Sequence, residues 1–229
     1  MKQQDDQCEK TPRPQAGRGT RNEINRMVGG YKKFRETYFG SESELFRKLK
    51  GGQTPKTLVI ACSDSRVDPA LLTGSKPGDI FVIRNVASLV PPYEPDTAHH
   101  GVSAALEYAV KILKVRNIII LGHSQCGGIR ELMCCENYHH TEFIGTWLEI
   151  AATVREDVRS RLGHLPLRQQ IRACEEAALL LGIENLQTFP WVRERVEAGT
   201  LALHAWYFHI GRGHLFHYDP AKGAFAAFK

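Results

Sequence analysis

A thiol, a carboxylate and a guanidinium stand close together in the segment ACSDSR, which covers positions 61–66. The apolar residues TLVI come directly before it and are typical of a strand that is buried on both faces. Cys62, Asp64 and Arg66 therefore follow the end of a buried strand. A hydrophobic core would not accept the two charges and a solvated turn would not need the strand, so this position calls for a chemical explanation.

A second set of reactive side chains follows another apolar run. The segment NIIILG at 117–122 predicts a buried strand, and His123 and Cys126 come directly after it in GHSQCGG. Ligands of open α/β sheets bind outside the carboxyl ends of the strands, so adjacent parallel strands would bring Cys62, His123 and Cys126 to one edge. Two thiolates and an imidazole suit Zn²⁺ and leave a fourth position for water. The alternative is two cysteines buried as small apolar residues and an ordinary loop histidine.

The elements that would position these residues alternate between strand and helix. Apolar runs at 57–61, 79–87 and 117–122 predict three buried strands. Residues 102–115 have apolar side chains at helical spacing and predict a helix between the second and third strands. This order predicts a mostly parallel central sheet with crossover helices.

The two ends of the chain add helices and a hairpin. Residues 21–39 predict a helix with Gly29–Gly30 as a candidate break, and a second helix would begin at Ser41 or Ser43 and close on Gly51–Gly52. The fold class that we expect is α/β, with flanking helices around the sheet and a C-terminal antiparallel strand or hairpin. The remaining signals are two helices broken near Gly163 and Pro166 within 141–182, a short helix after Pro190, and two final strands joined by GRG.

The composition is that of a globular domain and argues against a membrane-spanning or nucleic-acid-binding protein. The chain has 229 residues, 42% of them hydrophobic, and no apolar run approaches the roughly 18 residues that indicate a membrane span. Thirty basic and twenty-five acidic residues are mixed along the chain and give a net charge of +5, which argues against nucleic-acid binding. The polar residues 1–20 are expected to form a disordered tail, followed by a single α/β domain at 21–229.

Cysteine usage bears on the compartment. Six cysteines without a secretory signal predict reduced thiols rather than a disulfide framework. We therefore expect a cytoplasmic protein, and an organelle or a microcompartment is also compatible. Cys134, Cys135 and Cys174 lie on predicted helices, where we interpret them as buried or incidental.

The motifs resemble those of one enzyme family. CSDSR together with GHSQCGG is similar to the beta-class carbonic anhydrases, and the likeness extends through PGDIFVIRNVASLVPP and GVSAALEYAVKILKVRNIIILGHSQCGG. It covers roughly residues 30–220 in the order of elements. The resemblance implies that Cys62, His123 and Cys126 bind one Zn²⁺ per chain. It also implies the reaction CO₂ + H₂O ⇌ HCO₃⁻ + H⁺, because zinc lowers the pKa of bound water to about 7 and makes hydroxide available.

Asp64 and Arg66 then have a role in the same centre. Arg66 can hold the Asp64 carboxylate in a bidentate pair, which keeps it from becoming a fourth zinc ligand in an inactive form. Asp64 can then accept a hydrogen bond from the zinc-bound hydroxide and orient it towards CO₂. The resemblance implies the same pair, and the alternative is a structural ion pair at a helix start.

Four further residues are candidates for the substrate pocket. Equivalents of Gln53, Phe81 and Tyr108 line the pocket in the plant-type members, where the glutamine often comes across a dimer interface. Without the resemblance they are two core aromatic residues and a surface loop residue. Gly127, at the start of a predicted helix, would let the backbone pass close to the site.

One position bears on regulation. Some bacterial members carry a tryptophan three residues before the first cysteine ligand, as part of an inhibitory bicarbonate site. Val59 occupies that position here, although Arg84 of that site is present, and we therefore expect the active form. The histidine pairs 99–100 and 139–140 could relay protons, but nothing in their spacing places them near zinc.

The expected partners are CO₂ or bicarbonate and a second copy of the chain. A homodimer is the minimum unit that we expect, with higher homo-oligomers also open. The family resemblance implies it, and the amphipathic segment 31–39 has no obvious partner in a single sheet. Two rival functions remain: hydrolysis of CS₂ or COS on the same zinc scaffold, and a zinc or redox protein without enzymatic activity. Asp64 beside Arg66 argues against the second rival.

Overall fold

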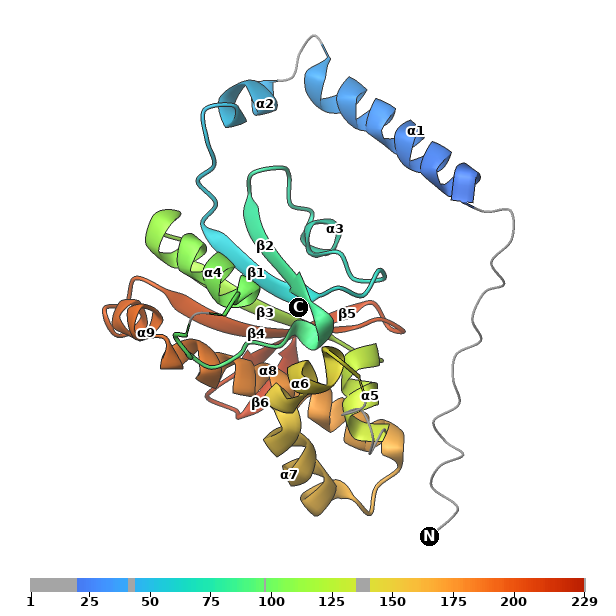
Figure 1. Cartoon of the computed structure of the whole chain (residues 1–229), viewed down its shortest axis with the longest axis vertical. Coiled ribbons are helices and arrows are strands. Elements are labelled where there is room, and N and C mark those ends of the chain that lie inside the picture. Colours follow the sequence, from blue (N-terminus) through green and yellow to red (C-terminus); the bar gives the residue numbers. More distant parts are fainter. Residues whose placement is uncertain (1–19, 41–43, 97, 135–140, 229) are drawn as a thin grey trace. The chain divides into compact units, whose positions relative to one another are not determined.

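The computed structural model describes residues 20–40, 44–96, 98–134 and 141–228 (Figure 1). The chain divides into two compact units, which end and begin at Gln53 and Thr54. Each unit is described by itself below. The predicted tail and the candidate caps Ser41 and Ser43 lie outside the described residues, and the prediction of a single domain over 21–229 stays a prediction.

The first unit contains two helices, α1 (Thr20–Phe39) and α2 (Glu44–Leu49). Aromatic rings hold them together: Phe46 stacks on Phe39 with 4.6 Å between centroids and meets Phe34 edge-on at 5.6 Å. The predicted break at Gly29–Gly30 is wrong, because α1 continues through both glycines. Each glycine costs a helix only about 1 kcal/mol, so favourable neighbours can carry the helix across the pair.

The second unit is built on a sheet whose six strands run in the order β2-β1-β3-β4-β5-β6 among the described residues. The first four are parallel to one another, and the last two are antiparallel, which confirms the predicted fold class and hairpin. The short strand β6 was not predicted, because AFAA has no alternating pattern. The strands are β1 (Thr57–Cys62), β2 (Ile80–Asn85), β3 (Asn117–His123), β4 (Ala202–His209), β5 (His214–Asp219) and β6 (Ala224–Ala227).

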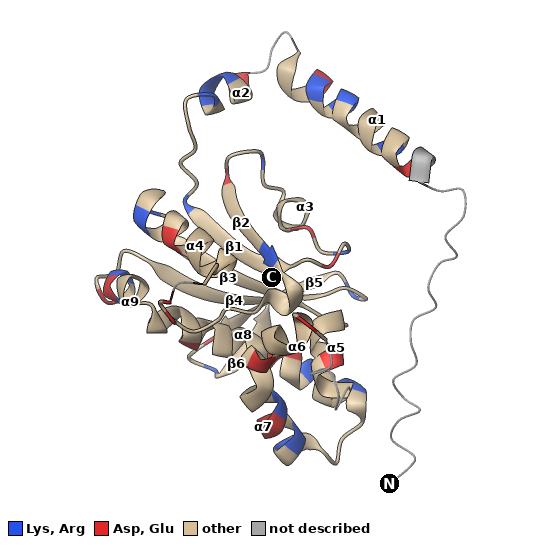
Figure 2. Cartoon of the chain, in the orientation of Figure 1, with Lys and Arg blue, Asp and Glu red and all other residues tan. Residues whose placement is uncertain are grey.

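The inner strands are uncharged. β1, β3 and β4 contain no Lys, Arg, Asp or Glu, as the tan colour of these strands shows (Figure 2). Five of the six residues of β1 and six of the seven of β3 are buried, as expected of strands covered on both faces. Charge therefore reaches the carboxyl edge of the sheet from the following loops and from Arg84 near the end of β2.

Helices cover one face of the sheet around the main core. This core joins Leu58, Ile60, Ile118 and Ile120 of the sheet to apolar residues of four helical segments. The predicted helix 102–115 is confirmed in part, since its second half is a π-helix that a 3.6-residue periodicity does not distinguish. The segments are α4 (Gly101–Glu107), the π-helix η3 (Tyr108–Ile112), α8 (Leu167–Thr188) and α9 (Pro190–Glu197).

Helix α8 approaches β3 closely through a glycine on each element. A Cβ at Gly122 of β3 would lie 2.7 Å from Leu179 Cδ2, and a Cβ at Gly182 of α8 would lie 2.7 Å from Ile120 Cδ1. This close packing brings the middle of α8 against the carboxyl end of β3. The ligand set and α8 are therefore neighbours.

The remaining short elements surround the carboxyl edge of the sheet. The predicted strand 79–87 ends two residues early, because residues 86 and 87 belong to a 3₁₀ turn, 86–88, after β2. The predicted helix break at 163–166 is confirmed between α7 and α8. These elements are α3 (Pro69–Thr73), η2 (Val86–Ser88), α5 (Gly127–Cys134), α6 (Ile144–Leu148), η5 (Glu149–Ala151) and α7 (Ala152–Leu162).

Candidate metal centre

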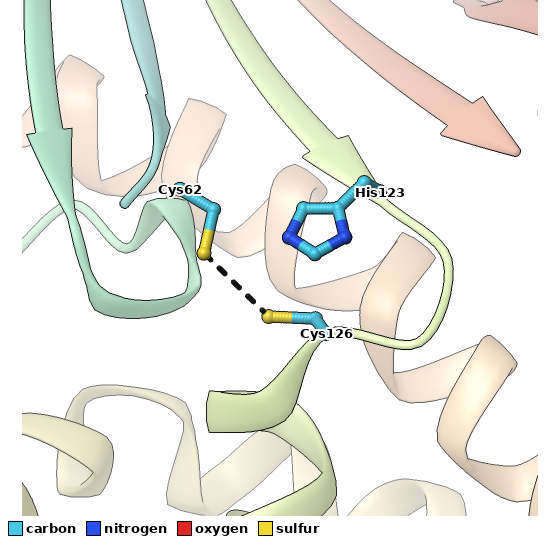
Figure 3. A group of neighbouring side chains, drawn as sticks. All are labelled: Cys62, His123 and Cys126. Atoms are coloured by element: carbon cyan, nitrogen blue, oxygen red, sulfur yellow. Dashed lines mark hydrogen bonds between the residues drawn. The ribbon is translucent and has the colours of Figure 1, made fainter. Parts of the chain in front are cut away.

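Three buried side chains meet at the carboxyl edge of the sheet. Cys62 is the last residue of β1, His123 is the last residue of β3, and Cys126 lies in the short loop before α5 (Figure 3). Their ligand atoms all lie within 4.8 Å of one another, and the two sulfur atoms are 4.0 Å apart. The parallel sheet thus brings together the three residues that the sequence singled out.

The imidazole of His123 is oriented as a ligand would be. Its Nδ1 lies 3.0 Å from the carbonyl oxygen of Ser124, so that nitrogen carries the proton and donates it. Its Nε2 is buried and has no hydrogen-bond partner among the described residues. A buried imidazole nitrogen without a partner is costly, and a metal ion on Nε2 would satisfy it.

The two thiols share one negative charge when no cation is bound. The hydrogen bond from Cys126, together with the neighbouring imidazole of His123 and the backbone N–H groups of Asp64 and Ala87, lowers the pKa of Cys62 to about 4. The same contact with Cys62, and then burial, raises the pKa of Cys126. Two thiolates at this separation require a cation between them, which fits the donor set of a zinc site.

The backbone around the thiols is tightly constrained. Ala87 has a left-handed conformation with φ 66°, and Gln125 in the ligand loop has φ 60°. A Cβ at Gly128 would lie 2.8 Å from Val86 Cγ1 and 3.0 Å from Ala87 Cβ, so only glycine fits there without a shift. Strained backbone of this kind persists where the surrounding structure fixes it.

Asp64 and Arg66 form a bidentate pair beside the ligands. Arg66 donates from Nε to Asp64 Oδ1 at 2.9 Å and from Nη2 to Oδ2 at 2.7 Å, and its backbone N–H also donates to Oδ1. These hydrogen bonds lower the pKa of Asp64 to about 2. Asp64 Oδ2 lies 3.9 Å from His123 Nε2, so the carboxylate borders the ligand set while Arg66 holds it.

Arg84 organises the loop that carries this pair. Its guanidinium donates to the backbone carbonyls of Cys62, Asp64 and Val67 at 2.8 to 3.0 Å, and its Nη1 lies 3.3 Å from Asp68 Oδ2. Sequence reasoning considered Arg84 only as part of a bicarbonate site. In the structure its donors are directed to the chain itself.

Within the second unit, two of the predicted pocket residues, Phe81 and Tyr108, lie away from the ligand set of their own chain. Phe81 pairs in register with Leu58, four residues before Cys62, which places it about 13 Å from the ligand end of the sheet. Tyr108 packs against Phe81 with 5.9 Å between ring centroids. Gln53 belongs to the first unit. Gly127 begins α5 directly after Cys126, and a Cβ there would meet nothing within 4 Å.

Within the described part of the chain, the other candidate residues do not join the group of ligand atoms. Cys174 is fully buried, which raises the pKa of its thiol to about 12, and Cys134 is partly buried. His100 contacts Asp96 at 2.6 Å in the segment before α4. Cys8, Cys135 and the pair 139–140 lie outside the described residues.

Sequence reasoning missed one residue next to the ligands. Glu175 of α8 is 4% exposed, and its Oε1 accepts the backbone N–H of Cys126 at 2.9 Å. A carboxylate directly after Cys174, on the apolar face that includes Ala178 and Leu179, was the available signal. Charged residues are rarely buried without a partner, so that position required one.

Comparisons with known proteins agree with this geometry. A family model described as carbonic anhydrase matches residues 57–215. A carbonic anhydrase of Synechocystis sp. is 38% identical over 205 residues, covering 89% of this chain and 74% of the relative. Beta carbonic anhydrase 3 of Arabidopsis thaliana is also 38% identical over 205 residues, covering 88% of this chain and 75% of the relative.

Solved structures show the same fold. The beta-carbonic anhydrase CcaA superimposes with a TM-score of 0.84 at 38% identity, covering 90% of this chain and 100% of that one. A structure from a study of two tetrameric beta-carbonic anhydrases of Sordaria macrospora gives a TM-score of 0.72 at 31% identity, covering 90% and 97%.

Fold and site together define an α/β protein in which two cysteines and one histidine, a group that could hold a metal ion, meet at the carboxyl edge of a parallel sheet. The chain belongs to the beta-carbonic anhydrase family. It is a carbonate dehydratase, a lyase that catalyses the reversible hydration of CO₂ to bicarbonate and a proton.

Proposed function

We propose that the chain catalyses this reaction with one zinc ion held by Cys62, His123 and Cys126. The observation that carries the proposal is the buried, unpartnered Nε2 of His123 within 4.8 Å of the two cysteine sulfurs. Bound zinc would supply a hydroxide nucleophile at neutral pH by lowering the pKa of water. The thiolates also receive backbone N–H groups, from Asp64 and Ala87 at Cys62 and from Gly128 and Ile129 at Cys126, which spread their charge.

Asp64 and Arg66 orient the reacting oxygen. The Asp64 carboxylate is ionised across the physiological range and borders the ligand set, so it can accept a hydrogen bond from the nucleophile. Arg66 occupies both carboxylate oxygens and holds Asp64 away from the position of a fourth ligand. The bidentate pair supports the active form of the site.

Bicarbonate inhibition at a second site is not part of this proposal. Val59 is 1% exposed within the sheet, where some bacterial members have a tryptophan. The donors of Arg84 are engaged by three backbone carbonyls. Both features support an enzyme without that anion site.

Metal analysis with an activity assay tests the proposal. We expect about one zinc per chain, a loss of zinc in Cys62→Ser and Cys126→Ser, and CO₂ hydration by stopped flow only in the zinc-bound protein. Full zinc content in both serine variants would refute the ligand assignment. A parallel assay with CS₂ addresses the rival hydrolase, which the matched families and relatives do not favour.

The assembly and the compartment belong to the same proposal. We propose a homodimer as the minimum unit and a cytoplasmic protein. Within the described residues, no helix is long and apolar enough to cross a membrane. Size-exclusion chromatography with light scattering, at micromolar concentration, tests the dimer.

A further inference from the structure

The loop that carries Cys126 is held by hydrogen bonds to other elements. On one side, the N–H of Ser124 donates to the carbonyl of Phe208 in β4, and Ser124 Oγ accepts the N–H of Ile210, both at 2.9 Å. These contacts tie the start of the loop to the β4–β5 hairpin. They do not fix Cys126 itself.

The middle of the loop is held by the catalytic pair. Arg66 Nη2 donates to the carbonyl oxygen of Gln125 at 3.0 Å, in addition to its hydrogen bonds with Asp64. Gln125 has a left-handed backbone with φ 60°, so this segment turns sharply before Cys126. A sharp turn needs a further anchor at its end if the Cys126 sulfur is to keep one position.

Glu175 provides that anchor. Its Oε1 accepts the backbone N–H of Cys126 at 2.9 Å, and its Oε2 accepts the hydroxyl of Tyr207 at 2.7 Å. Each carboxylate oxygen thus has one donor, on a side chain that is only 4% exposed. Burying a carboxylate is costly, and a leucine at this position would pack α8 against the loop without that cost. Helix packing alone therefore does not account for a glutamate here.

Tyr207 in turn has a fixed position. It is completely buried in β4, where its ring belongs to the main core, and the guanidinium of Arg172 lies 5.8 Å from the ring centroid. A rigid strand thus holds Tyr207, Tyr207 holds the Glu175 carboxylate, and Glu175 holds the backbone of a ligand. Such outer hydrogen bonds set the position and the affinity of metal ligands.

We propose that Glu175 is a positioning residue of the metal centre, whose buried carboxylate, held by Tyr207, fixes the backbone of Cys126 and thereby its sulfur. The inference rests on the proposed zinc site. It adds to that site a residue that does not contact the ion or the substrate but sets the geometry of one ligand.

The test uses full-length protein and four substitutions. Glu175→Leu removes both hydrogen bonds at similar volume. Glu175→Gln keeps an oxygen for the Cys126 N–H, and its amide can donate to the Tyr207 hydroxyl. Tyr207→Phe removes only the outer hydrogen bond. Glu184→Leu is the matched control, because Glu184 is an exposed carboxylate on the same helix, nine positions after Glu175.

Two readouts do not depend on activity. Zinc affinity is measured by competition with a chromophoric chelator, and ligand geometry is measured by the visible spectrum of the cobalt-substituted protein. We expect zinc affinity to fall about 10- to 100-fold in Glu175→Leu, the usual range for an outer-sphere substitution, and by less in Tyr207→Phe. Glu175→Gln should restore most of the affinity, and Glu184→Leu should match the wild type.

The outcomes separate this inference from the zinc assignment. A zinc-binding wild type whose affinity and cobalt spectrum are unchanged in both Glu175→Leu and Tyr207→Phe overturns only the role of Glu175. If Glu175→Leu does not fold, the Tyr207→Phe variant decides the question. Weakened zinc binding at a melting temperature equal to that of Glu184→Leu supports the role of Glu175, and unchanged binding overturns it. A wild type that binds no zinc overturns both.

Discussion

The negative charge of Asp64 can be balanced at this site either by the Arg66 guanidinium or by a metal ion beside His123. Arg66 holds both carboxylate oxygens, yet Oδ2 is still only 3.9 Å from His123 Nε2. The carboxylate therefore stands between a guanidinium and a metal-binding position. If Asp64 pairs with Arg66, the fourth ligand position stays open to water. If Asp64 binds the metal instead, that position is closed, so the hydrogen bonds from Arg66 determine the state of the site.

We expect Asp64→Asn and Arg66→Ala each to lower CO₂ hydration about 100-fold while zinc is retained, because misplacing a reacting group by about 1 Å costs this much. Asparagine can still accept a hydrogen bond but loses the charge that anchors Arg66. Alanine at 66 frees the carboxylate to close the fourth position. The double variant should be little worse than either single variant, since both break one unit.

Stopped-flow rates and zinc content of the three variants check this expectation. Asp219→Asn is the control, because Asp219 forms a comparable pair with Lys222, 3.0 Å away, at the end of β5. Near-normal rates in Asp64→Asn would mean that the pair is structural and that only Cys62 of this segment takes part in the chemistry.

A second residue-scale prediction concerns pH and stability. His204 is half-buried, burial lowers its pKa, and its Nε2 lies 3.2 Å from Asn117 Oδ1. It lines a pocket of about 560 Å³ that also includes Glu184 and His217. Below the usual histidine pKa of about 6.5 the unfolded chain binds a proton that the folded chain resists, so His204 lowers the free energy of unfolding as pH falls.

We therefore expect His204→Gln to flatten the loss of stability between about pH 7 and 5, measured by urea unfolding at several pH values. His164→Gln is the control, because His164 is exposed between α7 and α8. An identical pH dependence in wild type and His204→Gln would contradict the prediction.

At the scale of elements, the start of α5 presents two adjacent glycines with different surroundings. A Cβ at Gly128 would press on Val86 and on Ala87, which is held at φ 66° and donates its N–H to Cys62. A Cβ at Gly127 would meet nothing within 4 Å. The contact between α5 and η2 is therefore part of what shapes the thiolate environment.

Gly128→Ala should lower the free energy of unfolding by about 1–3 kcal/mol, the usual cost of overpacking, and should weaken zinc binding. Gly127→Ala should leave the free energy of unfolding unchanged or raise it, because alanine favours the helix. Chemical denaturation of both variants with zinc present compares them. Equal free energies of unfolding for the two variants would show that η2 can shift away from the added methyl group at little cost.

The sequence predicted this site well where local pattern decides the structure. The apolar runs before Cys62 and His123 predicted two parallel strands, and the rule for carboxyl edges then placed three ligands together. It did not predict the Glu175 contact with Cys126, because the two residues are 49 positions apart and meet only when α8 packs on β3. The π-helix at 108–112 and the left-handed Ala87 likewise depend on tertiary packing that no periodicity records.

At the scale of the whole molecule, large apolar side chains are exposed on the described residues of each unit. Ile24, Met27, Val28 and Tyr31 lie at helical spacing along α1 and are 47% to 65% exposed. In the second unit, Tyr108 is 44% exposed beside Phe81, and both lie towards the opposite end of the sheet from Cys62. If the predicted pocket role of these two aromatic residues is correct, they serve the metal centre of a second chain.

We expect mixed dimers to reveal this arrangement. Cys62→Ser removes a zinc ligand, and a chain with both Phe81→Ala and Tyr108→Ala keeps its zinc but would impair its partner's pocket. Co-expression with two affinity tags isolates dimers that contain one chain of each kind. If the aromatic residues act across the interface, the mixed dimer has one intact site, and its CO₂ hydration rate should be about half that of the wild type, well above the rate of either parent variant. If they act within their own chain, the mixed dimer has no intact site and its rate stays at the level of the parents. A chain that remains monomeric and fully active at micromolar concentration would refute the dimer itself.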